Sequence, residues 1–136
     1  MSSRFLKYFA LLLFLSSCGV SNKDFDKKRY RRSKTLAVYS GMANEFQDGY
    51  MVLKEHNYFK FYQTFWLIVT IKQGGYTGRY DIKNDTLYLN WGKTDPKQIK
   101  YYLSNKCLVD SSTKSLWFID EISNSKLWGL GLNPRK

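Results

Sequence analysis

The residues able to do catalytic chemistry are few in this chain, and their spacing does not group them. The sequence contains one histidine, His56, and two cysteines, Cys18 and Cys107. An activated nucleophile needs a base held by a third group, and a zinc site draws on several cysteine and histidine ligands. His56 is expected in a surface turn, and Cys107 lies in an apolar stretch that predicts a buried thiol. The sequence therefore predicts no catalytic residue, no metal site and no cofactor.

Carboxylates offer a weaker alternative. Asp120 and Glu121 are adjacent at the end of an expected strand, where a solvated pair is favoured over a calcium site. Four further aspartates would supply a catalytic pair if the fold brought them together: Asp81, Asp85, Asp95 and Asp110. Nothing in their spacing does so, and an enzyme is kept only as the least favoured alternative.

Cys18 points to a different chemistry, which is acylation. It ends the sequence Leu15-Ser16-Ser17-Cys18, after the apolar run 8–15 and the cations Arg4 and Lys7. This order resembles the signal peptide of a bacterial lipoprotein. The resemblance implies cleavage before Cys18 and acylation of its thiol and new amino group. An apolar run of this length is too short to span a bilayer, which takes roughly 20 residues. An ordinary secretory peptide cut near Ser16 or Ser17 is the alternative.

The resemblance also implies a location. Gly19 follows Cys18, whereas an Asp at that place favours retention in the inner membrane of enteric bacteria. We therefore expect a lipid-anchored protein of the cell envelope, at the outer membrane. The chain divides into a signal peptide at 1–17, a lipidated cysteine with a basic flexible tether at 18–34, and a folded domain at 35–136.

The tether carries the strongest charge feature of a chain whose formal net charge is +11. Its basic segment consists of Lys27, Lys28, Arg29, Arg31, Arg32 and Lys34. Close to an anionic membrane each such cation contributes about 1 kcal/mol of attraction. A membrane-proximal segment is therefore one interpretation, and a solvated linker is the other. Nucleic acid is not an expected partner, because an exported lipoprotein rarely meets it.

The folded domain is expected to be all-β. Turn signals recur every eight to twelve residues, which is typical of a meander, a sandwich or a barrel. Strict alternation over 76–83 and 86–91, around the turn at Asn84 and Asp85, predicts a hairpin with Leu87, Leu89 and Trp91 inward. Further strands are expected at 35–39, 50–54, 58–62, 65–71, 99–104, 107–109 and 116–119.

Three of these expectations concern irregular segments. The run 65–71 lacks alternation and should be buried on both faces or change faces midway, before Gly74 and Gly75 end it. A short helix is allowed near 41–48. The tail 127–132 is expected to form an edge strand or a plug. Together the pattern predicts an antiparallel meander of about eight strands that closes into a small, lipocalin-like barrel or half-barrel.

One further resemblance covers roughly residues 51–110. The Phe-rich strand Tyr58-Phe59-Lys60-Phe61 precedes a pattern that recurs in small lipoproteins of Bacteroidota, formed by Gly78, Tyr80, Ile82, Asp85, Leu87 and Leu89. Such proteins look like lipocalin-like or copper-resistance-lipoprotein-like meanders. The Cys-x-x-Cys pair that binds copper in the latter is absent from this chain. The resemblance implies a fold and no catalytic residue.

The expected function is a binding or structural role in the envelope, without catalysis. The partners would be the membrane, through the N-terminal lipid, and an envelope protein, glycan or lipid. A lipocalin-like carrier of a small apolar ligand is the alternative, because the domain is rich in aromatic residues.

Overall fold

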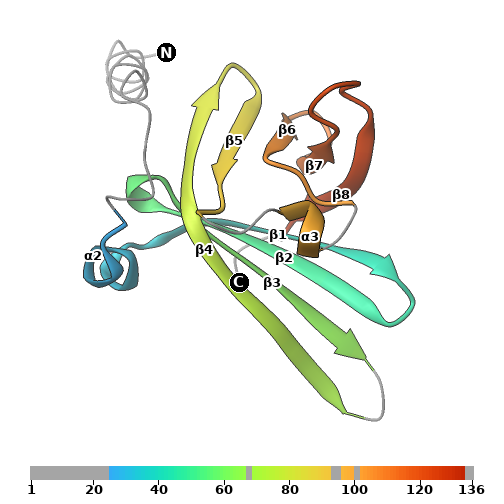
Figure 1. The fold of residues 1–136 in the computed structure, drawn as a ribbon, viewed down its shortest axis with the longest axis horizontal. Helices are drawn as coiled ribbons and strands as arrows, with labels where there is room; N and C mark the ends of the chain where they lie inside the picture. Colours follow the sequence, from blue (N-terminus) through green and yellow to red (C-terminus); the bar gives the residue numbers. More distant parts are fainter. Residues whose placement is uncertain (1–24, 67–68, 93–95, 100–101, 134–136) are drawn as a thin grey trace.

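The chain folds into a closed antiparallel barrel whose strands follow one another in sequence order (Figure 1). The computed structural model describes residues 25–66, 69–92, 96–99 and 102–133. Its strands are β1 (Thr35–Asn44), β2 (Gln47–Lys54), β3 (Tyr58–Trp66), β4 (Thr70–Lys83), β5 (Thr86–Asn90), β6 (Lys106–Asp110), β7 (Ser115–Ile119) and β8 (Lys126–Leu132). The short helices are α2 (Lys27–Arg32), the 3-10 turn η2 (Glu55–Asn57) and α3 (Pro96–Ile99).

Closure of the barrel depends on β8. Tyr39 and Ser40 of β1 pair with Leu132 and Gly131 of β8, so that the last strand returns to the first. The predicted all-β meander of about eight strands is confirmed, and the barrel is closed rather than half-open. The tail 127–132 is therefore neither an edge strand nor a plug, because β8 is paired with β7 and also with β1.

Strand β4 changes partners along its length. It pairs with β3 from Thr70 to Arg79, and with β5 only from Arg79 to Lys83. In the same way, β1 pairs with β2 along its whole length but meets β8 at two positions. As a result the hairpins β1–β2 and β3–β4 project beyond the rest of the barrel (Figure 1).

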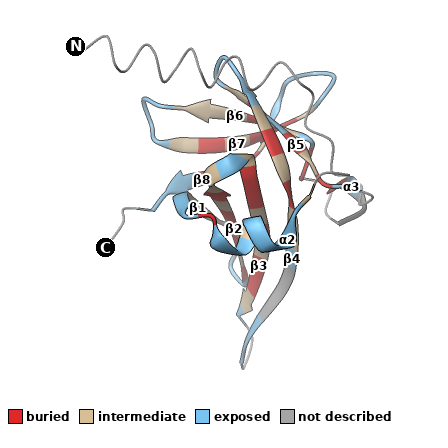
Figure 2. Cartoon of the chain, turned by 90° about the vertical axis from the view of Figure 1, so that its left-hand side faces the viewer, coloured by how far each residue is buried: buried red, intermediate tan, exposed pale blue. Residues whose placement is uncertain are grey.

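The barrel interior is filled by aromatic and aliphatic side chains. Figure 2 shows the buried residues, in red, along the strands of the barrel. Phe61 is fully buried, and its ring packs edge-on against Trp91, Phe118 and Trp128, with centroids 5.6, 5.9 and 6.2 Å away. Such edge-to-face contacts suit the charge distribution of aromatic rings. The inward positions Leu87, Leu89 and Trp91 of the predicted hairpin are buried, which confirms its register.

Two glycines allow this packing. A Cβ atom on Gly49 would lie 2.0 Å from the ring of Trp128, and one on Gly78 would lie 2.1 Å from the carbonyl oxygen of Asn90. Glycine is therefore required at these positions for close approach, since no other residue lacks a Cβ atom.

The structure differs from the sequence prediction in three local segments. Residues 41–48 form no helix, because β1 continues to Asn44 and turns directly into β2. Gly41 packs against β8, where a Cβ atom would lie 2.5 Å from the carbonyl oxygen of Gly129. Ladder pairing in the barrel here overrides a weak local preference.

The apolar run 65–71 is not a buried strand, and this prediction was wrong. Its described residues belong to the end of β3 and the start of β4, with Trp66 opposite Thr70, and residues 67–68 lie outside the described parts of the chain. Gly74 and Gly75 lie inside β4, at a bulge where the register between β3 and β4 shifts. Of the strand predicted at 99–104, Ile99 ends α3, residues 102–104 form no strand, and residues 100–101 lie outside the described parts of the chain. Helix α3 begins at Pro96. Proline is favoured in the first turn of a helix, which explains this start.

Candidate functional site

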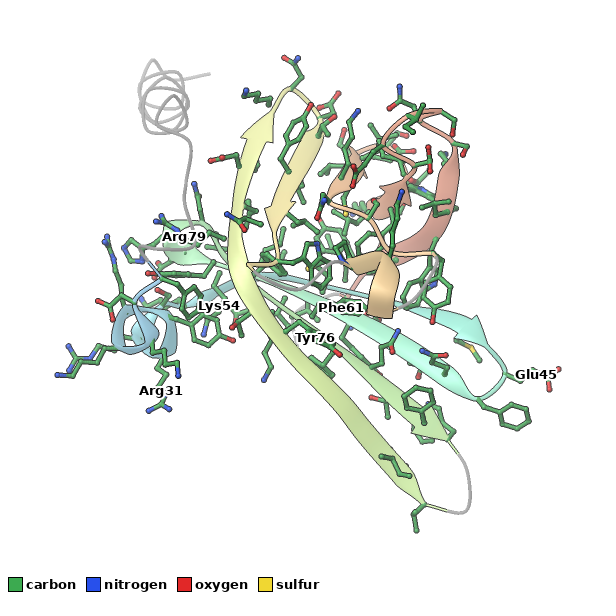
Figure 3. The ribbon with its side chains drawn as sticks, viewed as in Figure 1. Arg31, Glu45, Lys54, Phe61, Tyr76 and Arg79 are labelled. Atoms are coloured by element: carbon green, nitrogen blue, oxygen red, sulfur yellow. The ribbon has the colours of Figure 1, made fainter. Side chains whose placement is uncertain are left out.

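The basic segment forms a fixed helix at one end of the barrel. Asp26 caps α2, because its carboxylate accepts hydrogen bonds from the backbone N–H groups of Lys28 and Arg29 at 2.8 and 3.1 Å. Such a cap is worth about 1 kcal/mol. All six cations of the predicted basic segment are exposed: Lys27, Lys28, Arg29, Arg31, Arg32 and Lys34. Figure 3 shows Arg31 pointing away from the barrel.

An aromatic trio holds this helix on the outer face of β3. The rings of Phe25 and Tyr30 pack against Tyr58, with centroids 5.3 and 5.8 Å from it, and against each other at 5.5 Å. Tyr58 is only 2% exposed as a result. Tyr58 lies on the outer face of β3, and the rings that come with α2 bury it. Burial also raises the pKa of Tyr30 above its usual value.

Polar contacts complete the attachment at the end of α2. The Lys54 ammonium donates a hydrogen bond to the carbonyl oxygen of Tyr30 at 2.9 Å and lies 4.2 Å from its ring centroid. The Ser33 hydroxyl donates to the carbonyl oxygen of Arg29 at 2.7 Å, and His56 Nδ1 lies 3.0 Å from the same hydroxyl oxygen. A cation at a helix C-terminus is stabilising, because the last carbonyl groups have no partner within the helix.

The predicted tether at 18–34 is described from residue 25 on, where it includes the capped helix α2. Phe25 and Tyr30 order this part because they pack against a third ring, Tyr58 of β3. Cys18 and the signal peptide at 1–17 lie outside the described residues.

Two cations of the barrel join this end of the molecule, and the sequence did not single them out. Lys54 ends β2, and Arg79 lies opposite Tyr58 on β4, where its guanidinium is 5.3 Å from the Tyr58 ring centroid. Arg79 Nη2 also donates to the carbonyl oxygen of His56 at 3.3 Å. Figure 3 shows Lys54 and Arg79 beside α2. Only strand register could have placed them there.

Of the residues considered for catalysis, His56 lies at this end of the barrel beside Ser33. Cys107 is fully buried, and burial raises the pKa of its thiol well above the ordinary value. His56 is exposed in η2, as expected of a turn residue. Asp120 caps the β7–β8 turn, and the N–H groups of Ser123 and Ile122 that bind its carboxylate lower its pKa. Glu121 accepts a bond from the backbone N–H of Asn105.

No three histidine, cysteine, aspartate or glutamate side chains gather as a metal cluster within the described parts of the chain. Asp95 lies outside those parts. Likewise, none of the helices in the described ranges has the length and apolar character needed to cross a membrane.

These observations define a small, lipocalin-like up-and-down β-barrel that carries a basic helix on the outside of one end. Comparison of the chain with models of known protein families, with curated proteins and with solved structures finds no significant match in any of the three.

Proposed function

We propose that this chain is a lipid-anchored domain of the cell envelope with a binding or structural role and no catalytic activity. The observation that carries the proposal is the fixed position of α2. Six exposed cations of one short segment sit on a single end of the barrel, and this end is where the chain from Cys18 arrives.

The distance along the chain favours contact with the membrane that would hold the lipid. Six residues lie between Cys18 and Phe25, and the seven Cα–Cα steps that join the two reach at most about 25 Å. The cations of α2 would then stay near the lipid headgroups, where each contributes about 1 kcal/mol within a Debye length of roughly 10 Å. Lys54 and Arg79 add charge to the same end.

The barrel interior supports a binding or structural role over a carrier. A carrier of a small apolar ligand needs an enclosed space, whereas the centre of this barrel is occupied by Phe61, whose ring packs against Trp91, Phe118 and Trp128. A partner would then be met by the outer surface of the domain.

The anchor is tested by mass spectrometry of the protein purified from the membrane fraction. We expect an N-terminal peptide that begins at Cys18 and carries acyl chains. The variant Cys18→Ser should lose the acyl mass and the anchor, while Cys107→Ser, which changes the other cysteine, should keep both. An unmodified N-terminus in the wild-type chain would refute the proposal.

A further inference from the structure

The ends of the two projecting hairpins expose a group of large apolar side chains, which we call the apolar tips. Their members are Met42, Phe46, Trp66, Val69 and Ile71, with exposed fractions of 64%, 58%, 48%, 65% and 43%. The other exposed large hydrophobic residues of the described chain are spread over separate places, such as Ile82 and Ile122. A cluster of this kind marks a contact surface, while single exposed apolar residues are ordinary.

The two hairpins are bonded to each other, which brings Phe46 and Trp66 together. Ile71 pairs with Phe65 and therefore faces the other side of the sheet from Trp66. The backbone N–H of Trp66 donates to the carbonyl oxygen of Phe46 at 2.7 Å. The indole N–H of Trp66 donates to the Asp48 carboxylate at 2.9 Å, which fixes the ring on the outer face of β2 and β3. Figure 3 shows Glu45 at the end of the β1–β2 hairpin, beyond the barrel.

The outer face of β3 carries several aromatic and cationic side chains between the tips and α2. Trp66 comes first, the mostly buried Thr64 follows, and Tyr62 is next, stacked on Tyr50 with ring centroids 4.8 Å apart. Lys60 is next, with its ammonium 5.6 Å from the Tyr62 ring centroid, and Tyr58 beneath the cations of α2 is last. Apolar groups, then tryptophan and tyrosine, then cations is the order of preference from the acyl region of a bilayer to its headgroups.

From this order we infer that the apolar tips enter a lipid bilayer, so that the domain lies with the outer face of β1–β4 toward the membrane. Trp66 and Tyr58 are eight residues apart on β3, or about 26 Å, so a tilted domain touches one membrane with both the tips and α2. The inference deepens the proposed function and rests on it for the presence of a membrane.

Shape and charge select a bilayer over other occupants. The tips are projecting hairpin ends rather than a groove, and a fluid bilayer adapts to such ends without a matching pocket. Glu45 next to Phe46 limits the depth of entry, because an ionised carboxylate is costly to move from water into hydrocarbon. The insertion is therefore shallow and does not depend on anionic lipid at this end.

The test uses the four tryptophans of the chain and phosphatidylcholine vesicles that contain brominated lipid, which quenches nearby indole emission. We expect quenching in the wild-type chain that disappears in Trp66→Phe and persists in Trp117→Phe, the matched change on β7. Quenching should fall strongly in the double variant Phe46→Ser/Val69→Ser. It should remain in Ile82→Ser/Ile122→Ser, which removes two exposed apolar residues elsewhere. Glu45→Gln should move Trp66 deeper.

The outcomes separate the tips from the anchor. Cys18→Ser, measured in parallel, still shows quenching of Trp66 if the tips bind lipid by themselves, whatever happens to the N-terminal lipid. Absence of quenching in vesicle-bound wild-type protein overturns the inference. It is also overturned if Phe46→Ser/Val69→Ser leaves quenching intact, or if sedimentation shows that the tips are covered by a second copy of the chain.

Discussion

Each end of β3 carries an aromatic residue on the same outer face, but one of the two is buried and the other is exposed. Tyr58 is covered by α2 and is 2% exposed, whereas Trp66 at the hairpin end is 48% exposed. Both side chains are fixed, the first by Phe25 and Tyr30 and the second by Asp48. The alternation of β3 is the same at both places, so the neighbouring elements alone decide whether an aromatic becomes core or contact surface.

This difference divides the tasks of the outer face. At the Tyr58 end the aromatic surface is buried under α2. The cations of that helix are exposed to solvent. At the Trp66 end no described element covers the rings, and apolar surface itself is exposed. A membrane accommodates both kinds of surface, cations at the headgroups and apolar tips below them.

Removing the buried aromatic should have the largest effect on stability. Tyr58→Ala deletes the ring on which α2 rests and should lower the free energy of unfolding by about 3 kcal/mol. The control Tyr88→Ala, on an exposed side chain, should cost under about 1 kcal/mol. Urea denaturation of the purified protein measures both. Equal losses in the two variants would show that α2 is not held by Tyr58.

The second prediction is that alkaline pH lowers the free energy of unfolding through Tyr80, which contacts Lys54 near α2. Burial, and then the nearby Tyr39, raises the pKa of Tyr80 to about 12 from 10.0, and its hydroxyl reaches the carbonyl oxygen of Lys54 at 3.4 Å. Because the folded pKa is the higher one, the neutral phenol's contribution is complete below pH 10 and is lost as the pH rises through 12. A shift of this size corresponds to a loss of about 3 kcal/mol at most.

This pH dependence is checked by denaturation at a series of pH values. Tyr80→Phe should flatten the fall in stability between pH 10 and 12. If the variant keeps the same slope, another group is responsible.

Crowding the junction between the projecting hairpins and the barrel should cost 1–2 kcal/mol, roughly. Gly49→Ala places a Cβ atom 2.0 Å from the Trp128 ring, whereas Gly131→Ala meets its nearest atom at 3.8 Å. Thermal unfolding should therefore show a lower Tm for the first variant and little change for the second. Unchanged stability of Gly49→Ala would mean that Trp128 has room to move.

Loss of the helix cap should have a smaller effect, confined to α2. Asp26→Ala removes the acceptor of two backbone N–H groups and should cost about 1 kcal/mol. Asp26→Asn should retain most of the stability, because asparagine also caps helices well. Faster amide exchange in residues 27–32 of Asp26→Ala, with the barrel unchanged, is the expected measurement. Equally faster exchange across the barrel would contradict it.

The exposed aromatic should matter least to folding. Trp66→Phe loses the bond from the indole to Asp48 and should cost roughly 0.5–1 kcal/mol, a smaller loss than that of Tyr58→Ala. The same urea titration decides this. A loss as large as that of Tyr58→Ala would mean that Trp66 serves the core and would remove the contrast between the two ends.

Much of the barrel could be predicted from the sequence, because strict alternation records which face of a strand is buried. The hairpin around Asn84 is confirmed with Leu87, Leu89 and Trp91 inward, and Cys107 is buried as its apolar neighbours predicted. The basic segment could also be predicted, because its charge follows directly from the residues it contains. These features depend on residues close together in the chain.

The remainder depended on contacts between distant segments. Phe25 and Tyr30 order α2 only because β3 brings Tyr58 beneath them, and Trp66 and Phe46 become one surface only through the pairing of β2 with β3. Closure of the barrel likewise requires Leu132 of β8 to pair with Tyr39 of β1. Local pattern specifies which way a side chain faces along its own strand, whereas the neighbour that covers it or leaves it exposed is set by tertiary packing.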